Sequence, residues 1–161
     1  MTASFRRALW LFPAALIVHN LEEAVWLPAW SQSAGAFHPP VRAPSFHFVL
    51  VVATLVGLFL TFMASRRGGG WLTACSGAWG VMLGNVLMPH LLATLVQRRY
   101  APGLGTALLA TLPADGYLLW RAVSEKQLRW RSFGIAMAVA VPLTLGGMAA
   151  LLWVGDRLFP V

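Results

Sequence analysis

Long apolar runs, separated by short clusters of basic residues, are the feature that most constrains this chain. Of its 161 residues, 58% are hydrophobic and only 11% are charged, which is too little polar surface for a water-soluble domain of this length. A bilayer interior admits only helices or closed barrels, because every backbone polar group must be paired within the protein. Since the runs are long and unbroken, they favour helices of about 20 residues. The sequence therefore predicts an all-α integral membrane protein.

The apolar runs predict a single polytopic domain, a bundle of about five transmembrane helices. The expected spans are 8–27, 46–64, 71–96, 103–120 and 133–154. Four prolines inside them are expected to kink the helices and free backbone carbonyls: Pro13, Pro89, Pro113 and Pro142. Gly77, Gly80 and Gly84 in the third span would allow close contact with another helix, within the chain or in a homo-oligomer.

The distribution of basic residues predicts the orientation of the bundle. Five spans would place eight of them on the side of the N-terminus: Arg6, Arg7, Arg66, Arg67, Arg121, Lys126, Arg129 and Arg131. The opposite side would receive four: Arg42, Arg98, Arg99 and Arg157. This bias predicts a cytoplasmic N-terminus and an external C-terminus. The net charge of +7 is thus interpreted as a topology signal, and no nucleic-acid partner is expected.

His19, Glu22 and Glu23 form the one chemically informative cluster, and they lie inside the first predicted span. A charged side chain at the centre of a bilayer costs about 2.5 to 3.5 kcal/mol and normally faces a polar interior. Residues three and four positions after His19 lie on either side of its helical face, so both carboxylates would flank the imidazole. This arrangement predicts a functional site in which all three side chains act in catalysis or metal binding.

Other spans are expected to bring further polar residues to the same depth. His90 would join the site from the third span, with Asn85 and His47 as supporting residues and His38 in the loop above. A single histidine or asparagine in a span can also be a packing residue or join two helices by a hydrogen bond. Asp115, near Tyr117 and Arg121, is interpreted as a structural ion pair or the partner of a helix break.

Arg98, Arg99 and Tyr100 form a second group, at the predicted outer rim of the site. These arginines could bind an anionic group of a substrate, or they could extend to lipid headgroups. The single cysteine, Cys75, lies in an apolar stretch and is expected to be a small buried residue without a thiolate site.

The sequence from His19 to Glu23, His-Asn-Leu-Glu-Glu, resembles the bacterial membrane proteins named for their HXXEE motif. The resemblance extends to residues 85–90 and 99–103, and to Thr106 and Pro113. It implies a multispan helical protein of the bacterial inner membrane, with His19, Glu22 and Glu23 as the defining residues. It implies no reaction, substrate or cofactor.

The residues favour a metal-dependent membrane enzyme. Imidazole and carboxylate ligands suit zinc, iron or manganese, and His19, Glu22 or Glu23, and His90 would leave open positions at the ion. The remaining glutamate would be the general base. Such a site would hydrolyse or oxidise a lipid-soluble or amphiphilic molecule that enters from the outer leaflet.

Two alternatives use the same residues without a resident catalytic metal. In the first, the glutamates and His19 act as acid and base in an isomerase or transferase. In the second, the protein is not an enzyme but a small transporter, a proton path or a haem protein with His19 and His90 as axial ligands.

Overall fold

The computed structural model describes residues 1–160, which are largely helical and contain no strand. The elements in chain order are α1 (Ala3–Ala8), α2 (Leu11–Ser31), the 3₁₀ turn η1 (Gly35–Phe37), α3 (Ala43–Arg67), α4 (Gly69–Asn85), the π-helical η2 (Val86–Leu91), α5 (Leu92–Gln97), α6 (Leu104–Thr106), the π-helical η3 (Ala107–Thr111), α7 (Leu112–Ser124) and α8 (Trp130–Leu158). The all-α fold class is therefore confirmed.

Four helical segments are long and apolar enough to cross a membrane. They are Ala3–Ser31, Ala43–Arg67, Gly69–Gln97 and Trp130–Leu158, and they match the first, second, third and fifth predicted spans. The fourth predicted span, 103–120, is helical from Leu104 onward, but it is not among these four segments, and it contains Asp115. The protein is thus a multi-pass membrane protein, and the fifth crossing stays a prediction.

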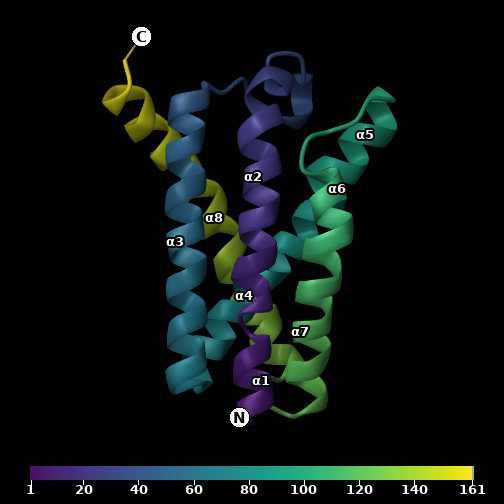
Figure 1. Ribbon diagram of the computed structural model, residues 1–161, viewed down its shortest axis with the longest axis vertical. Helices are drawn as coiled ribbons and strands as arrows, with labels where there is room; N and C mark the ends of the chain where they lie inside the picture. The colour runs from purple at the N-terminus through teal and green to yellow at the C-terminus, as the bar shows by residue number, and fades with distance from the viewer. Residues whose placement is uncertain (161) are drawn as a thin grey trace.

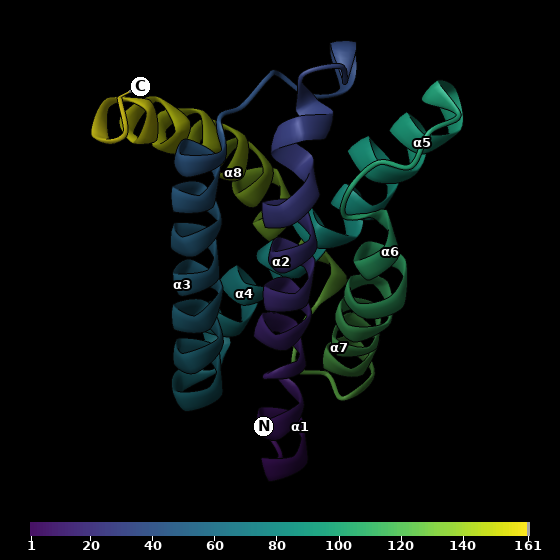
Figure 2. The same ribbon diagram turned by 45° about the horizontal axis from the view of Figure 1, so that its top comes forward.

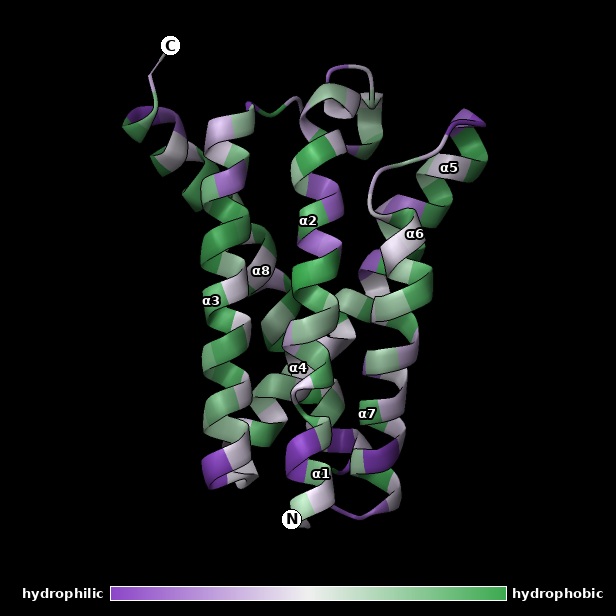
Figure 3. Ribbon diagram, viewed as in Figure 1, coloured by the Kyte–Doolittle hydropathy of each residue, from purple (hydrophilic) through white to green (hydrophobic). Residues whose placement is uncertain are grey.

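The helices run up and down between two ends of the molecule, with the N-terminus at one end and the C-terminus at the other (Figure 1). In the view of Figure 2, α8 leans away from the bundle toward its C-terminal end. Its 29 residues include only two buried ones, Ala136 and Gly155. Large apolar side chains cover much of the outer surface, and polar residues gather toward the ends of the bundle (Figure 3). This distribution suits a protein surrounded by lipid.

Helices α4 and α8 approach each other at two glycines. A Cβ atom at Gly77 would lie 2.9 Å from the carbonyl oxygen of Ala136, and one at Gly80 would overlap the Met137 side chain. A Cβ atom at Gly84 would meet no atom within 4 Å. Two of the three glycines predicted to allow close helix contact therefore do so within the chain.

The α4–η2 junction sets the direction of the side chains that matter for the site. Pro89 cannot donate a backbone hydrogen bond, and the adjacent Met88 leaves the helical conformation with φ −138° and ψ 119°. In a regular α-helix, residues five apart point about 140° away from each other. The irregular turn instead directs the side chains of Asn85 and His90 to the same place, where they are in contact.

Candidate metal centre

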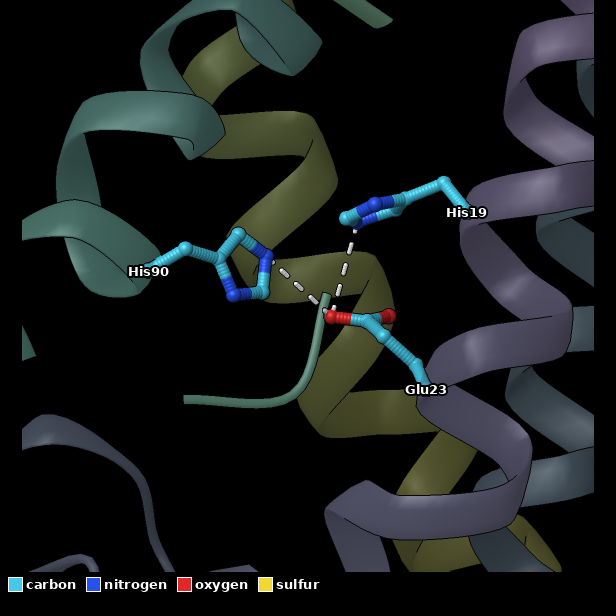
Figure 4. Close-up of side chains that lie close together, drawn as sticks. All are labelled: His19, Glu23 and His90. Carbon is cyan, nitrogen blue, oxygen red and sulfur yellow. Dashed lines mark ion pairs between the residues drawn. The ribbon is translucent and has the colours of Figure 1, made fainter. Parts of the chain in front are cut away.

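His19, Glu23 and His90 converge on one point between α2 and η2 (Figure 4). One ligand atom from each residue lies within 4.8 Å of the other two. Glu23 Oε1 is 3.3 Å from His90 Nε2 and 3.6 Å from His19 Nε2. Both histidines are 1% exposed, and the Glu23 side chain is 12% exposed. The cluster is therefore almost fully shielded from solvent and lipid.

Helix α2 supplies two of the three side chains because His19 and Glu23 are four residues apart on one helical face. The third comes from the irregular turn described above. The rings of His19 and His90 meet edge to face, with centroids 5.0 Å apart and planes at 80°. This arrangement brings both Nε2 atoms toward the same carboxylate oxygen.

Asn85 completes the inner part of the cluster. Its amide nitrogen lies 3.2 Å from His19 Nε2 and 3.0 Å from His90 Nε2. The two amide hydrogens can each be donated to one imidazole, which requires that both Nε2 atoms carry lone pairs. Alternatively, rotation of the amide would turn its oxygen into the cluster, because the two orientations have the same shape.

The other nitrogen of His19 is held by a chain of side chains. His19 Nδ1 lies 3.1 Å from Thr106 Oγ1, and the Thr106 hydroxyl donates to Glu22 Oε2 at 2.6 Å. Because the hydroxyl hydrogen is used on Glu22, its oxygen is free to accept a hydrogen bond from His19 Nδ1. The Glu22–Thr106–His19 chain therefore favours the tautomer of His19 whose Nε2 carries a lone pair, which a metal ligand or a base would need.

Glu22 turns away from the cluster and binds the turn before α6. Its carboxylate accepts hydrogen bonds from the backbone amides of Gly103 at 2.9 Å and Thr106 at 3.0 Å. It also accepts one from the Tyr100 hydroxyl. Partial burial raises the pKa of Tyr100, and the neighbouring Glu22 carboxylate raises it further, so the phenol stays neutral and donates its hydrogen. Glu22 thus ties α2 to the start of α6.

Gly103 closes the cluster on one side. Its φ of +95° is in the region that favours glycine. A Cβ atom there would overlap the His90 ring and lie 2.9 Å from His19 Cε1. The backbone of the turn therefore packs directly against both imidazoles, and only a residue without a side chain fits.

The structure separates the predicted site residues into two groups. It brings together His19, Glu23, His90 and Asn85, and it places Glu22 and Tyr100 in the adjoining hydrogen-bond network. His47 lies apart, with Nε2 2.9 Å from the Ala24 carbonyl oxygen, and His38 Nδ1 contacts the carbonyl oxygen of Pro39.

The two arginines of the predicted rim are exposed. Arg99 donates to Ser33 Oγ at 3.0 Å, and its guanidinium lies 5.8 Å from the centre of a Trp30 ring. Arg98 adopts a left-handed backbone conformation with φ 50° at the end of α5. Both residues therefore stay at the edge of the α5–α6 turn, and neither touches the cluster.

The predicted ion pair of Asp115 is wrong. Arg121 is held instead by Glu125, with its Nε 2.5 Å from Glu125 Oε1. Both carboxylate oxygens of Asp115 are buried without a hydrogen-bond partner among the described residues. The helical positions of Arg121 and Glu125, four residues apart, explain why this pair forms locally.

Sequence reasoning assigned no role to Thr106 or Gly103, although both connect directly to the cluster. Neither residue type signals a site by itself, since threonine and glycine are common in spans. The available signal was that both residues belong to the part of the chain that resembles the HXXEE-motif proteins.

Comparison with known proteins places the chain in a family. A family model described as "Protein of unknown function with HXXEE motif" matches residues 10–118. The chain belongs to the HXXEE-motif family. The "Uncharacterized protein YrkK" of Bacillus subtilis (strain 168) is 34% identical over 153 residues, which cover 92% of this chain and 96% of that relative. No solved structure matches the chain.

The HXXEE motif has a divided role in this structure. Its histidine and its second glutamate, His19 and Glu23, point into the cluster, while its first glutamate, Glu22, points to the α5–α6 turn. The matched range ends at residue 118 and includes every residue of the cluster and of the network around it.

Proposed function

We propose that this HXXEE-motif protein is a metal-dependent enzyme of the bacterial inner membrane. His19, Glu23 and His90 would bind one divalent ion, zinc, iron or manganese. Its substrate would be a lipid-soluble or amphiphilic molecule that is hydrolysed or oxidised. The observation that supports this most strongly is the convergence of three electron-rich ligand atoms within 4.8 Å in a shielded place.

One of the ligand separations matches a tetrahedral ion. Two ligands bound to one tetrahedral zinc at about 2.0 to 2.1 Å lie about 3.3 Å apart, and the Glu23–His90 contact has this length, while the Glu23–His19 contact of 3.6 Å would have to shorten on binding. With the Asn85 amide oxygen turned into the cluster, the facing lone pairs would repel, and a cation or a proton among them would relieve that repulsion. The fixed tautomer of His19 also agrees with a ligand role, because metal-bound histidines commonly donate the other ring nitrogen to a supporting group.

The side chains of the cluster and around it would have separate roles in the reaction. A bound ion would supply Lewis-acid polarisation of a substrate oxygen or activation of a water molecule. Glu23, the cluster member with a partly exposed edge, can accept a proton as the substrate approaches. Thr106 and Glu22 hold the His19 ring, and Asn85 can orient a polar substrate group by donating from its amide.

An apolar cavity near the cluster supports a lipid-soluble substrate. It has a volume of about 580 Å³ and lies among α2, α3, α4 and α8, and its lining includes Leu16 and Met82. Each of these is three residues before a cluster residue, His19 on α2 and Asn85 on α4. An apolar chain in this cavity would therefore lie about one helical turn from the cluster. Arg99, at the predicted outer side, is available to an anionic headgroup.

Acid–base catalysis without a metal is the second candidate. Glu23 is close enough to both imidazoles to form an ion pair if either ring is protonated, which would equally satisfy the converging lone pairs. Haem fits the geometry less well. The Glu23 carboxylate and the Asn85 amide lie against both Nε2 atoms, and Gly103 packs on both rings, so a planar macrocycle between His19 and His90 would displace them.

Metal content of the full-length protein, purified in detergent without chelators, tests the proposal. We expect about one equivalent of zinc, iron or manganese by elemental mass spectrometry. His19→Ala, His90→Ala and Glu23→Gln should each lose the ion. His47→Ala is the matched control, because it removes an exposed histidine whose ring hydrogen-bonds to the Ala24 backbone carbonyl and lies apart from the cluster.

Each result has a defined meaning. Loss of the ion in the three cluster variants, with retention in His47→Ala, would support a metal site at the cluster. An ion that is retained in all variants would be bound elsewhere, and its absence from folded wild-type protein supplied with each metal would contradict the proposal. In that case acid–base catalysis by the same residues without an ion would be the candidate that remains.

A further inference from the structure

Asp115 on α7 is a buried polar group that the proposed function does not use. It is 0% exposed, and neither of its carboxylate oxygens has a hydrogen-bond partner among the described residues. It lies nine residues after Thr106, which corresponds to about 13 Å along the helix. Asp115 is therefore a second polar centre, separate from the histidine cluster.

No described cation neutralises this carboxyl group. Arg121, the nearest basic residue along the chain, binds Glu125 at 2.5 Å and also donates to Tyr117 Oη and Ser4 Oγ, each at 3.1 Å. Cys75 on α4 lies within electrostatic range of Asp115 and carries no positive charge. An isolated carboxylate anion in an apolar interior is far less stable than the neutral acid.

One further polar side chain beside Asp115 also lacks a partner among the described residues. Thr111 precedes Asp115 by one helical turn and is 1% exposed, and its hydroxyl is unsatisfied. Buried polar groups without partners are rare in proteins, so two of them one helical turn apart on the same helix face mark this place as a candidate polar site.

The unsatisfied atoms have complementary chemistry if Asp115 carries a proton. A neutral carboxylic acid has one donor and free acceptor sites, and a threonine hydroxyl has both. One or two water molecules can join these groups, since a buried water typically makes about three hydrogen bonds. An anionic Asp115 with the same neighbours would still lack a compensating charge.

We propose that Asp115 and Thr111 form an intramembrane proton-binding site. Asp115 binds the proton as a neutral carboxylic acid, and the Thr111 hydroxyl hydrogen-bonds to this acid directly or through a water molecule. The site is independent of whether the histidine cluster binds a metal. It lies on the face of α7 toward α4, about 13 Å from the level of Thr106.

Infrared spectroscopy of the full-length protein tests whether Asp115 holds a proton. We expect a carbonyl stretching band of a protonated carboxylic acid in wild-type protein at neutral pH, shifted in heavy water, and lost in Asp115→Asn. Glu125→Gln is the control, because Glu125 is paired with Arg121 and the band should persist. Asp115→Asn has nearly the shape of the neutral acid and should keep the thermal unfolding temperature of wild-type protein.

Labelling with a hydrophobic carbodiimide, which reacts with protonated carboxyl groups in membranes, gives a second measurement. The peptide that contains Asp115 should gain one adduct, and the labelling rate should fall about tenfold per pH unit above the titration midpoint. If Asp115→Asn fails to fold, Asp115→Glu should retain both the adduct and a displaced band.

Two outcomes would overturn the proposal. The first is an infrared spectrum in which folded Asp115→Asn and wild-type protein are indistinguishable in the carboxylic-acid region. The second is a thermal unfolding temperature of wild-type protein that rises with sodium or potassium, independently of pH, and no longer does so in Asp115→Asn. That result would assign the site to a metal cation instead of a proton.

Discussion

Glu22 and Glu23 are neighbours in the sequence, yet their carboxylates belong to different structures. Glu23 faces two imidazoles, with its Oε1 atom 3.3 and 3.6 Å from their nitrogens. Glu22 accepts two backbone hydrogen bonds and two from hydroxyl groups across the α5–α6 turn. The difference follows from the rotation of about 100° between successive residues of a helix. Removing the charge of Glu22 and removing that of Glu23 should therefore have different effects on the protein.

We expect Glu22→Gln to lower the stability of the fold while most of the bound metal is retained. A glutamine has one oxygen acceptor, so its amide group would face backbone N–H donors and leave them unsatisfied, at a cost of about 1 to 3 kcal/mol. Glu23→Gln should instead abolish metal binding with a smaller loss of stability. Thermal unfolding and metal content of both variants check this, and equal losses of metal in the two would contradict the assignment.

Thr106→Val should weaken metal binding without changing the ligands. Valine keeps the shape of threonine but removes the hydroxyl that joins Glu22 to His19 Nδ1. Loss of such a supporting group typically lowers metal affinity by about 10- to 100-fold. Competition with a fluorescent chelator measures the affinity. Thr106→Ser keeps the hydroxyl and should stay close to wild-type affinity, so a loss of the same size in both variants would show that packing is the cause.

The sequence identified the members of the cluster but could not assign the two glutamates. Positions three and four after His19 both flank its helical face, so their spacing treats Glu22 and Glu23 alike. What distinguishes them is the set of donors at Gly103 and Thr106, which lie 81 and 84 residues away. Only the tertiary fold supplies this information.

At the scale of elements, an irregular turn and a tight loop build the cluster together. Pro89 predicted a kink in the third span, and residues 86–91 form the π-helical η2. The direction of the kink was not predictable, because a proline removes a hydrogen bond without fixing where the next turn points. The contact of Asn85 with His90 depends on that direction.

Gly103→Ala should disrupt the cluster through the α5–α6 turn. The new Cβ atom would require a left-handed backbone conformation and would overlap the His90 ring, so we expect a loss of about 2 kcal/mol or more and of metal binding. Gly134→Ala is the control, because its Cβ atom would meet nothing within 4 Å and alanine favours a helix. The unfolding temperature and the metal content of Gly134→Ala should equal or exceed those of wild-type protein.

For the whole molecule, the two sides predicted from the basic residues correspond to the two ends of the helical bundle. The eight basic residues assigned to one side lie on α1, at the end of α3, and around the α7–α8 connection, at the end that contains the N-terminus (Figure 1). Arg121 at the end of α7 reaches Ser4 on α1 with a hydrogen bond of 3.1 Å. The opposite end holds Arg42, which pairs with Asp156 at 2.6 Å. This segregation is the pattern expected of a fixed orientation in the membrane.

The crossing of 104–124 decides the topology, because hydropathy alone supports four spans. Five crossings place Ser124 in the cytoplasm and Pro160 outside, whereas four place Ser124 outside and Pro160 in the cytoplasm. Single cysteines at these two exposed positions, in a Cys75→Ala background, would report the difference through labelling of intact cells with a membrane-impermeant maleimide. Ser33→Cys, on the α2–α3 connection, is external under both topologies and serves as the positive control.

We expect Pro160→Cys to be labelled from outside and Ser124→Cys to be protected until the membrane is permeabilised. The physical reason is that 104–124 packs along α2 and α4 and that its one acidic residue, Asp115, is fully buried, so this carboxyl group faces protein instead of lipid. The reverse labelling pattern would show that this segment does not cross. The α5–α6 turn and the α7–α8 connection would then lie on the same side of the membrane, and the charge bias would have to be explained without a fifth span.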